Sequence, residues 1–117
     1  MSSKIKKNTI TLTRGDTLRV FIELFRDGEP YTPIEGDSIR FALKHTEKTA
    51  GGKEYVDTDP LILKNVPIDT MLLELEPSDT KPLDFGTYVY DLEITFADGS
   101  VDTFITEATF ELTGEVH

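Results

Sequence analysis

The sequence predicts an all-β protein in which two antiparallel sheets stack as a sandwich. Several stretches alternate apolar and polar residues with a period of two, which is typical of strands with one face in a core. Turn-forming Gly, Asp and Pro residues separate these stretches at short intervals, and no stretch has the length of an ordinary helix. We expect about seven to eight strands in a single domain that spans residues 1–117.

The clearest strand follows Asp84 and Gly86. From Tyr88 to Phe96 its even positions are all apolar or aromatic, and its odd positions are mostly polar, so the even-numbered side chains are expected in the core. The spacing Asp84-x-Gly86-x-Tyr88 is the signature of a tyrosine corner, in which the Tyr hydroxyl bonds to upstream backbone. Tyr90 stands where a disulfide-bonded immunoglobulin domain carries its second Cys. The predicted fold is therefore an immunoglobulin-like antiparallel β-sandwich.

The other elements can be assigned in chain order. Residues 1–7 are basic and are expected to form a flexible tail or the start of an edge strand. In the rest of the chain, each strand can be placed by whether its apolar residues fall at odd or at even positions. The remaining strands are expected at residues 9–13, 17–25, 38–44, 69–76 and 101–112. Residues 55–63 are expected to form one or two short extended pieces, interrupted at Asp59-Pro60.

Turn chemistry accounts for the breaks between these strands. Asp-Gly pairs at residues 27–28 and 98–99 are hairpin signals, and Gly51-Gly52 lies within a polar loop. Residues 77–82 form the one helix-like stretch, with Ser78 as its expected N-terminal cap.

Two further features follow from the pattern. The apolar residues of the last strand change parity between Ile105 and Ala108, which predicts a β-bulge or bend within that range. The 38–44 strand is expected to pair with the Tyr88 strand. This pairing would bring opposite charges together on an outer face, namely Arg40, Lys44, Asp91 and Glu93.

Composition restricts the possible partners. The formal net charge of −10 argues against a nucleic-acid partner, because binding to phosphates requires a basic face. No apolar run is long enough for membrane insertion, and the basic N-terminus lacks the apolar region of a signal peptide. The absence of Cys excludes disulfides and thiolate metal sites. Residues 1–53 carry ten basic and seven acidic residues (net +3), whereas residues 54–117 carry two and fifteen (net −13), a polarity that a contact between copies could use.

We find no catalytic, cofactor-binding or metal-ligating constellation in the sequence. His45 lies in a polar loop and His117 ends the chain, so neither has the setting of a general base. The expected protein is therefore not an enzyme and needs no cofactor. An alternative is a carbohydrate-binding module, to which Tyr31 and Tyr55 in loops would contribute exposed rings.

One feature favours a protein partner. In the 17–25 strand, Phe21 and Phe25 occupy the face opposite the core and are expected to join Leu72 of a neighbouring strand in an apolar patch. We interpret this patch as a candidate subunit interface in a homo-oligomer. The alternative is that residues 51–66 fold over and cover it.

A set of short motifs occurs in a fixed order along nearly the whole chain. These motifs are Thr13-Arg14-Gly15-Asp16-Thr17, Gly36-Asp37-Ser38-Ile39-Arg40-Phe41, Asp79-Thr80, Gly86-Thr87-Tyr88-Val89-Tyr90-Asp91, Asp98-Gly99, Thr103 and Phe110-Glu111-Leu112-Thr113-Gly114-Glu115-Val116. In this order they resemble small phage proteins. The chain is similar to the immunoglobulin-like domain of tail and baseplate proteins from phages and prophages of Gram-positive bacteria, including the N-terminal domain of siphophage baseplate upper proteins.

The resemblance implies a structural role without catalytic residues. Such a domain acts as an adaptor that docks onto a tail or baseplate core through self-assembly or contacts with other tail proteins. Its expected location is the virion tail, or the cytoplasm of a bacterium that carries the prophage. Full-length baseplate proteins continue into further parts, whereas this sequence stops at His117, so we expect either a stand-alone accessory protein or one domain of a longer protein.

Overall fold

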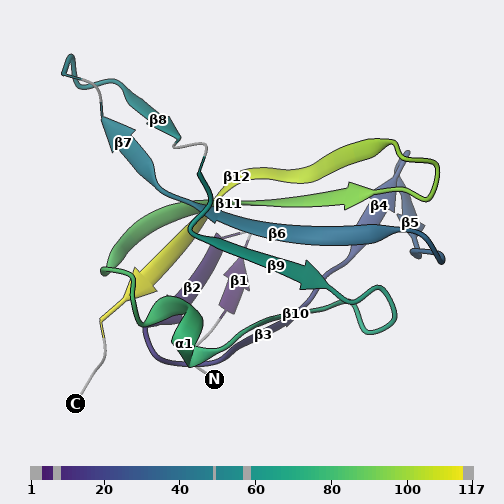
Figure 1. Cartoon of the computed structure of the whole chain (residues 1–117), viewed down its shortest axis with the longest axis horizontal. Helices are drawn as coiled ribbons and strands as arrows, with labels where there is room; N and C mark the ends of the chain where they lie inside the picture. Colours follow the sequence, from purple (N-terminus) through teal and green to yellow (C-terminus); the bar gives the residue numbers. More distant parts are fainter. Residues whose placement is uncertain (1–3, 7–8, 49, 57–58, 115–117) are drawn as a thin grey trace.

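The computed structural model describes residues 4–6, 9–48, 50–56 and 59–114 of the chain. Strands dominate this part, and its one helix is the single turn α1 (Pro77–Thr80) (Figure 1). The predicted all-β class is therefore confirmed. Of the expected N-terminal tail, Lys4–Lys6 forms an edge strand, β1, whereas residues 1–3 and 7 lie outside the described residues.

The largest sheet has six strands in the order β1-β2-β12-β11-β6-β9. Neighbouring strands are antiparallel except β2 and β12, which run parallel. Because β6 pairs with β11, the expected pairing of the 38–44 strand with the Tyr88 strand is confirmed. The six strands are β1 (Lys4–Lys6), β2 (Thr9–Thr13), β6 (Ser38–Lys44), β9 (Ile62–Val66), β11 (Gly86–Thr95) and β12 (Val101–Thr113).

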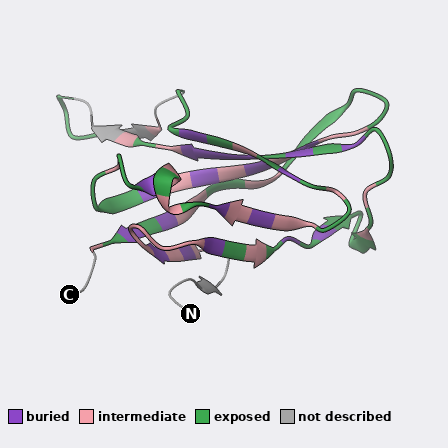
Figure 2. Ribbon diagram, turned by 60° about the horizontal axis from the view of Figure 1, so that its bottom comes forward, coloured by how far each residue is buried: buried purple, intermediate pink, exposed green. Residues whose placement is uncertain are grey.

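Three two-stranded sheets complete the described structure. These pairs are β3 (Leu18–Phe21) with β10 (Leu72–Leu75), β4 (Leu24–Arg26) with β5 (Glu29–Tyr31), and β7 (Thr46–Lys48) with β8 (Glu54–Val56). One hydrophobic core joins the large sheet to the β3–β10 pair, because buried residues of both belong to the same cluster. Figure 2 shows the buried positions alternating with intermediate or exposed ones along several strands.

The core follows the period-two pattern of β11. Tyr88, Tyr90, Leu92 and Ile94 are all buried, and the next even residue, Phe96, is half-buried. The ring of Tyr90 packs between those of Phe41 and Phe110, with centroid distances of 5.5 and 6.5 Å. Burial of Tyr90 raises the pKa of its hydroxyl to about 12. The even-numbered side chains therefore lie inside, as the sequence predicts.

The tyrosine corner has the geometry expected from its spacing. The Tyr88 hydroxyl donates a hydrogen bond to the backbone carbonyl oxygen of Asp84, with an oxygen–oxygen distance of 2.7 Å. β11 begins at Gly86, between these two residues. The bond ties the loop that enters β11 to the first buried ring of the strand.

The expected 17–25 strand is interrupted. β3 ends at Phe21 and β4 begins at Leu24. At the break, the amide of Ile22 donates to the carbonyl oxygen of Met71 at 2.8 Å, and Met71 has a positive φ of 54°. The prediction of one continuous strand is therefore wrong, because the chain bends at Ile22 and pairs with a different partner strand on each side.

The expected irregularity in the last strand is present. Tyr90 lies opposite Ala108, but Leu92 lies opposite Ile105, so two residues of β12 face one residue of β11. Within this bulge Glu107 has a φ of 48°. A second register shift follows between Leu92 and Glu93. The bulge predicted between Ile105 and Ala108 is thus confirmed, and the second shift was not predicted.

The single helical turn is capped differently from the expectation. Glu76, rather than Ser78, is the N-cap residue. The Asp79 carboxylate accepts a hydrogen bond from the backbone amide of Glu76 at 2.7 Å, which completes a capping box. The prediction for Ser78 is wrong because an acidic residue three positions after Glu76 satisfies the cap earlier in the chain.

Candidate assembly surface

The three residues of the candidate interface lie on the outside of the described structure. Phe21 pairs with Leu72 across β3 and β10. Phe21 is 75% exposed, Phe25 is 59% exposed, and Leu72 is half-buried. Large aromatic rings at such exposure are unfavourable in water and mark surfaces that bind partners. We call Phe21, Phe25 and Leu72 the phenylalanine face.

The described part of residues 51–66 does not cover this face. β9 (Ile62–Val66) pairs with β6 at the end of the large sheet opposite β1. The hairpin of β7 and β8 follows the C-terminal end of β6 and projects away from the large sheet (Figure 1). The alternative in which this segment folds over Phe21 and Phe25 is therefore wrong for the residues that the structure describes.

A cavity of about 460 Å³ opens beside the phenylalanine face. One side of the cavity is formed by the β3–β4 break, with Phe21, Ile22 and Phe25, and the other by Phe104 and Ile105 of β12. Core residues of β11 and β2 also line it. The cavity lies where the β3–β4 break faces the bulged part of β12. We call it the seam cavity.

A polar cluster around Asp37 connects β5, the loop before β6 and the β11–β12 hairpin. The carboxylate of Asp37 accepts hydrogen bonds from the Tyr31 hydroxyl at 2.7 Å and from the backbone amides of Ile34 and Ala97 at 2.9 Å each. Asp37 thereby links the loop before β6 to the β11–β12 hairpin. These donors, with the Ile34 amide contributing most, hold the pKa of Asp37 below its ordinary value of about 3.8.

Tyr31 packs within this cluster instead of presenting an open ring. Its ring meets that of Phe96 edge to face, with centroids 5.6 Å apart, and the guanidinium of Arg26 lies 4.3 Å from the Phe96 ring centre. The hydrogen bond to Asp37 raises the pKa of the Tyr31 hydroxyl. Tyr31 is therefore positioned as a structural residue. The side chain of Tyr55, the other residue proposed for sugar binding, lies outside the described residues.

Replacement of Asp37 by Asn is expected to change the pH dependence of stability. When folding lowers the pKa of a carboxylate, the group stabilises the native state at pH values above its pKa in the unfolded chain. This contribution is lost as the pH falls through the pKa of the carboxylate in the folded chain. The melting temperature of the wild type should therefore exceed that of Asp37→Asn at neutral pH, and the gap should shrink below about pH 4. Thermal unfolding followed by circular dichroism at several pH values measures this. A pH-independent gap would contradict the assignment.

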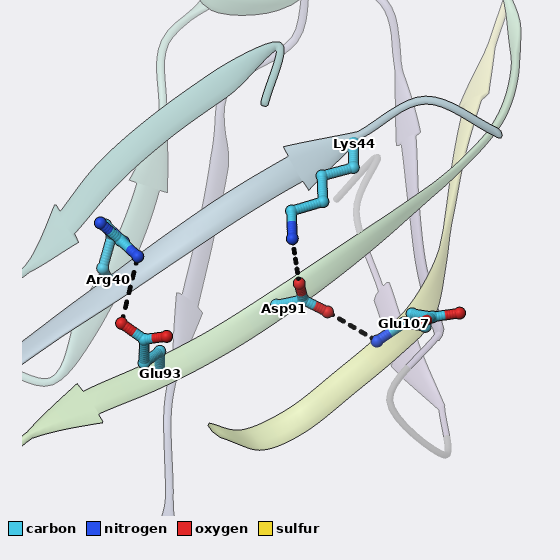
Figure 3. A network of polar contacts seen from close by, with 5 residues as sticks. All are labelled: Arg40, Lys44, Asp91, Glu93 and Glu107. Atoms are coloured by element: carbon cyan, nitrogen blue, oxygen red, sulfur yellow. Dashed lines mark hydrogen bonds and ion pairs between the residues drawn. The ribbon is translucent and has the colours of Figure 1, made fainter. Parts of the chain in front are cut away.

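The outer face of β6 and β11 carries the predicted cross-strand charges. Arg40 Nη2 lies 3.1 Å from Glu93 Oε1, and Lys44 Nζ lies 2.8 Å from Asp91 Oδ2 (Figure 3). The second oxygen of Asp91 accepts a hydrogen bond from the backbone amide of Glu107 at 2.7 Å. Asp91 therefore anchors the β12 bulge to the central strand, a role that the sequence pattern did not indicate.

Replacement of Asp91 by Ala is expected to cost about 1–2 kcal/mol of unfolding free energy, because the Glu107 amide loses a charge-assisted bond. The matched control is Glu93→Ala, which removes only the more exposed ion pair with Arg40 and should cost under about 1 kcal/mol. Urea unfolding of both variants provides the comparison. Equal losses in the two variants would show that the bond to the bulge adds nothing.

Other kinds of site were sought in the described part of the chain. It contains no group of three or more His, Cys, Asp or Glu side chains placed to hold a metal ion. It also contains no helix that is long and apolar enough to cross a membrane. Fold and surface together define an all-β protein with an exposed aromatic face. Comparisons with protein-family models, with curated proteins and with solved structures found no match for this chain.

Proposed function

We propose that this chain is a non-enzymatic structural or adaptor protein of a phage or prophage tail or baseplate, which acts by assembling with itself or with other tail proteins. The observation that carries the proposal is the phenylalanine face. Two aromatic rings that are more than half exposed on neighbouring strand segments need a partner to remove them from water. The ordered motifs that resemble phage tail domains give the class of partner.

The strand pairings support an immunoglobulin-like sandwich as the finer description of the fold. In such a fold the tyrosine-corner strand lies between two antiparallel neighbours, and β11 lies between β6 and β12. The second sheet of the sandwich would be the β3–β10 pair, which shares the core. The hydrogen bond from Tyr88 to Asp84 supports the same assignment.

Sedimentation velocity over a wide range of protein concentration tests the proposal. We expect reversible self-association, which the double variant Phe21→Asp/Phe25→Asp weakens by about 30-fold or more, because aromatic anchors carry about 2 kcal/mol or more at interfaces. The matched control is Leu63→Asp on β9, which is 53% exposed and lies away from the phenylalanine face. It should associate like the wild type.

Two results would oppose the proposal. Equal weakening by Leu63→Asp would show that association depends on general surface hydrophobicity and not on this face. A wild-type chain that stays monomeric at all concentrations, and that does not bind tail proteins encoded beside its own gene, would remove the assembly function.

A further inference from the structure

One edge of β12 lies open along most of its length. Its other edge pairs with β11, whereas this edge pairs with β2 only from Phe110 to Thr113. Among the described residues, no strand pairs with it from Val101 to Thr109. Such an edge offers backbone donors and acceptors to a further strand. It also borders the seam cavity, since Phe104 and Ile105 belong to both. A strand added here would therefore cover exposed core residues as well as complete the sheet.

The open edge is acidic. Asp102 and Glu107 lie on the β12 segment, and Glu23 is the one charged residue among the described residues that line the seam cavity. The first seven residues of the chain contain Lys4, Lys6 and Lys7 and no acidic residue. Charge complementarity therefore favours a strand from the N-terminus as the occupant.

The chain does not place its own N-terminal strand there. β1 pairs with β2 and lies on the side of β2 away from β12. Among the described residues, β1 is therefore the terminal strand of the large sheet, and no described strand pairs with its outer edge. Two copies related by a two-fold axis can satisfy both edges at once, because a two-fold contact is reciprocal.

We propose that the chain forms a two-fold dimer in which β1 of each copy pairs with the open Val101–Thr109 edge of the other. The direction of the strands is consistent. Within one copy, β2 runs parallel to β12 and antiparallel to β1, so β1 and β12 run in opposite directions. A two-fold rotation about an axis perpendicular to the sheet reverses the strand directions of the second copy. β1 of one copy therefore runs parallel to β12 of the other. The β1–β2 hairpin of each copy continues the sheet of the other. The strand β1, which is basic in sequence, then runs along the acidic edge of the second copy.

This dimer deepens the proposed function and rests on it, because it names a second copy as the partner that closes the seam. The added β1 strand would lie beside the seam cavity, which Phe21 and Phe25 of the phenylalanine face also line. The open β12 edge and the phenylalanine face then belong to one continuous surface.

A charge-swap experiment on the full-length chain tests the dimer. Variant A carries Lys4→Glu and Lys6→Glu, and variant B carries Asp102→Lys and Glu107→Lys. In a dimer of either variant alone, like charges meet at both reciprocal contacts, so each should dimerise at least about ten-fold more weakly than the wild type. In a mixture, opposite charges meet at both contacts of an A–B heterodimer. The acidic β1 of A faces the basic edge of B, and the basic β1 of B faces the acidic edge of A. Sedimentation should therefore show a 1:1 heterodimer in preference to either homodimer.

A control and two contrary outcomes complete the test. Glu29→Lys/Glu35→Lys changes the charge by the same amount as variant B at exposed positions away from the edge, and it should dimerise like the wild type. If A and B associate as well as the wild type, or if mixing does not produce the heterodimer, the β1–β12 contact is refuted while assembly through another face stands. If the wild type never associates, self-assembly and this contact are refuted together.

Discussion

Replacement of Phe110 by Ala is expected to lower the free energy of unfolding by about 4 kcal/mol. Phe110 is fully buried, and its ring packs against those of Phe41 and Tyr90 with centroid distances of 6.4 and 6.5 Å. It lies opposite Tyr88 in β11 and opposite Ile10 in β2, so its removal leaves a cavity where three strands meet. Urea unfolding at low protein concentration measures the loss.

The matched control for this substitution is Phe21→Ala. The same ring is removed, but Phe21 is 75% exposed, so the monomer should change by no more than about 0.5 kcal/mol. A comparable loss in both variants would contradict the placement of Phe110 inside and Phe21 outside. A large difference at low concentration also separates stability from assembly, since Phe21 is expected to matter only for association.

Replacement of Gly36 by Ala is expected to cost about 3 kcal/mol, the sum of backbone strain and crowding. Gly36 has a φ of 98°, which L residues rarely adopt, and a Cβ at this position would lie 2.8 Å from the Cβ of Ala97. The contact joins the same two loops that Asp37 links through its bond to the Ala97 amide. The loss should appear in the thermal midpoint and in the unfolding free energy.

Gly28→Ala separates the two causes. Gly28 also has a positive φ, of 79°, but a Cβ added at this position would meet no heavy atom within 4 Å. This variant should therefore lose only the strain component, about 1–2 kcal/mol. If Gly36→Ala is no worse than Gly28→Ala, the loop before β6 and the β11–β12 hairpin are not packed as closely as described.

Much of the fold could be predicted because it depends on local patterns. Alternation over Tyr88–Phe96 identifies the central strand and its buried face, and one parity change locates the bulge in β12. The ion pair of Arg40 with Glu93 follows once the two strands are paired. In each case, the period of two in the sequence specifies the side of the sheet on which a side chain lies.

The features that could not be predicted depend on contacts between residues far apart in the chain. The bend at Ile22 requires a carbonyl group from Met71, and the bond network of Asp37 requires the Ala97 amide, 60 residues later. Neither partner leaves a periodic signal. Parallel pairing of β2 with β12 is also invisible in the sequence, because apolar alternation is the same in parallel and antiparallel edges.

The candidate site was only partly predictable for the same reason. The exposed rings of Phe21 and Phe25 follow from parity, because they alternate with Ile22 and Leu24 in the core. The seam cavity does not, because it forms only where the β3–β4 break meets the bulged segment of β12. Local sequence patterns therefore predict the exposed rings of Phe21 and Phe25 but not the seam cavity beside them.

Amide hydrogen exchange at low and high protein concentration tests the central claim, assembly through the open β12 edge and the phenylalanine face. We expect the amides of β11 to be protected at both concentrations, because β6 and β12 flank this strand. The outward-facing amides of Val101–Thr109 should exchange rapidly in the monomer and gain protection on association. Association that leaves this edge unprotected, or that protects β9 instead, would contradict the claim.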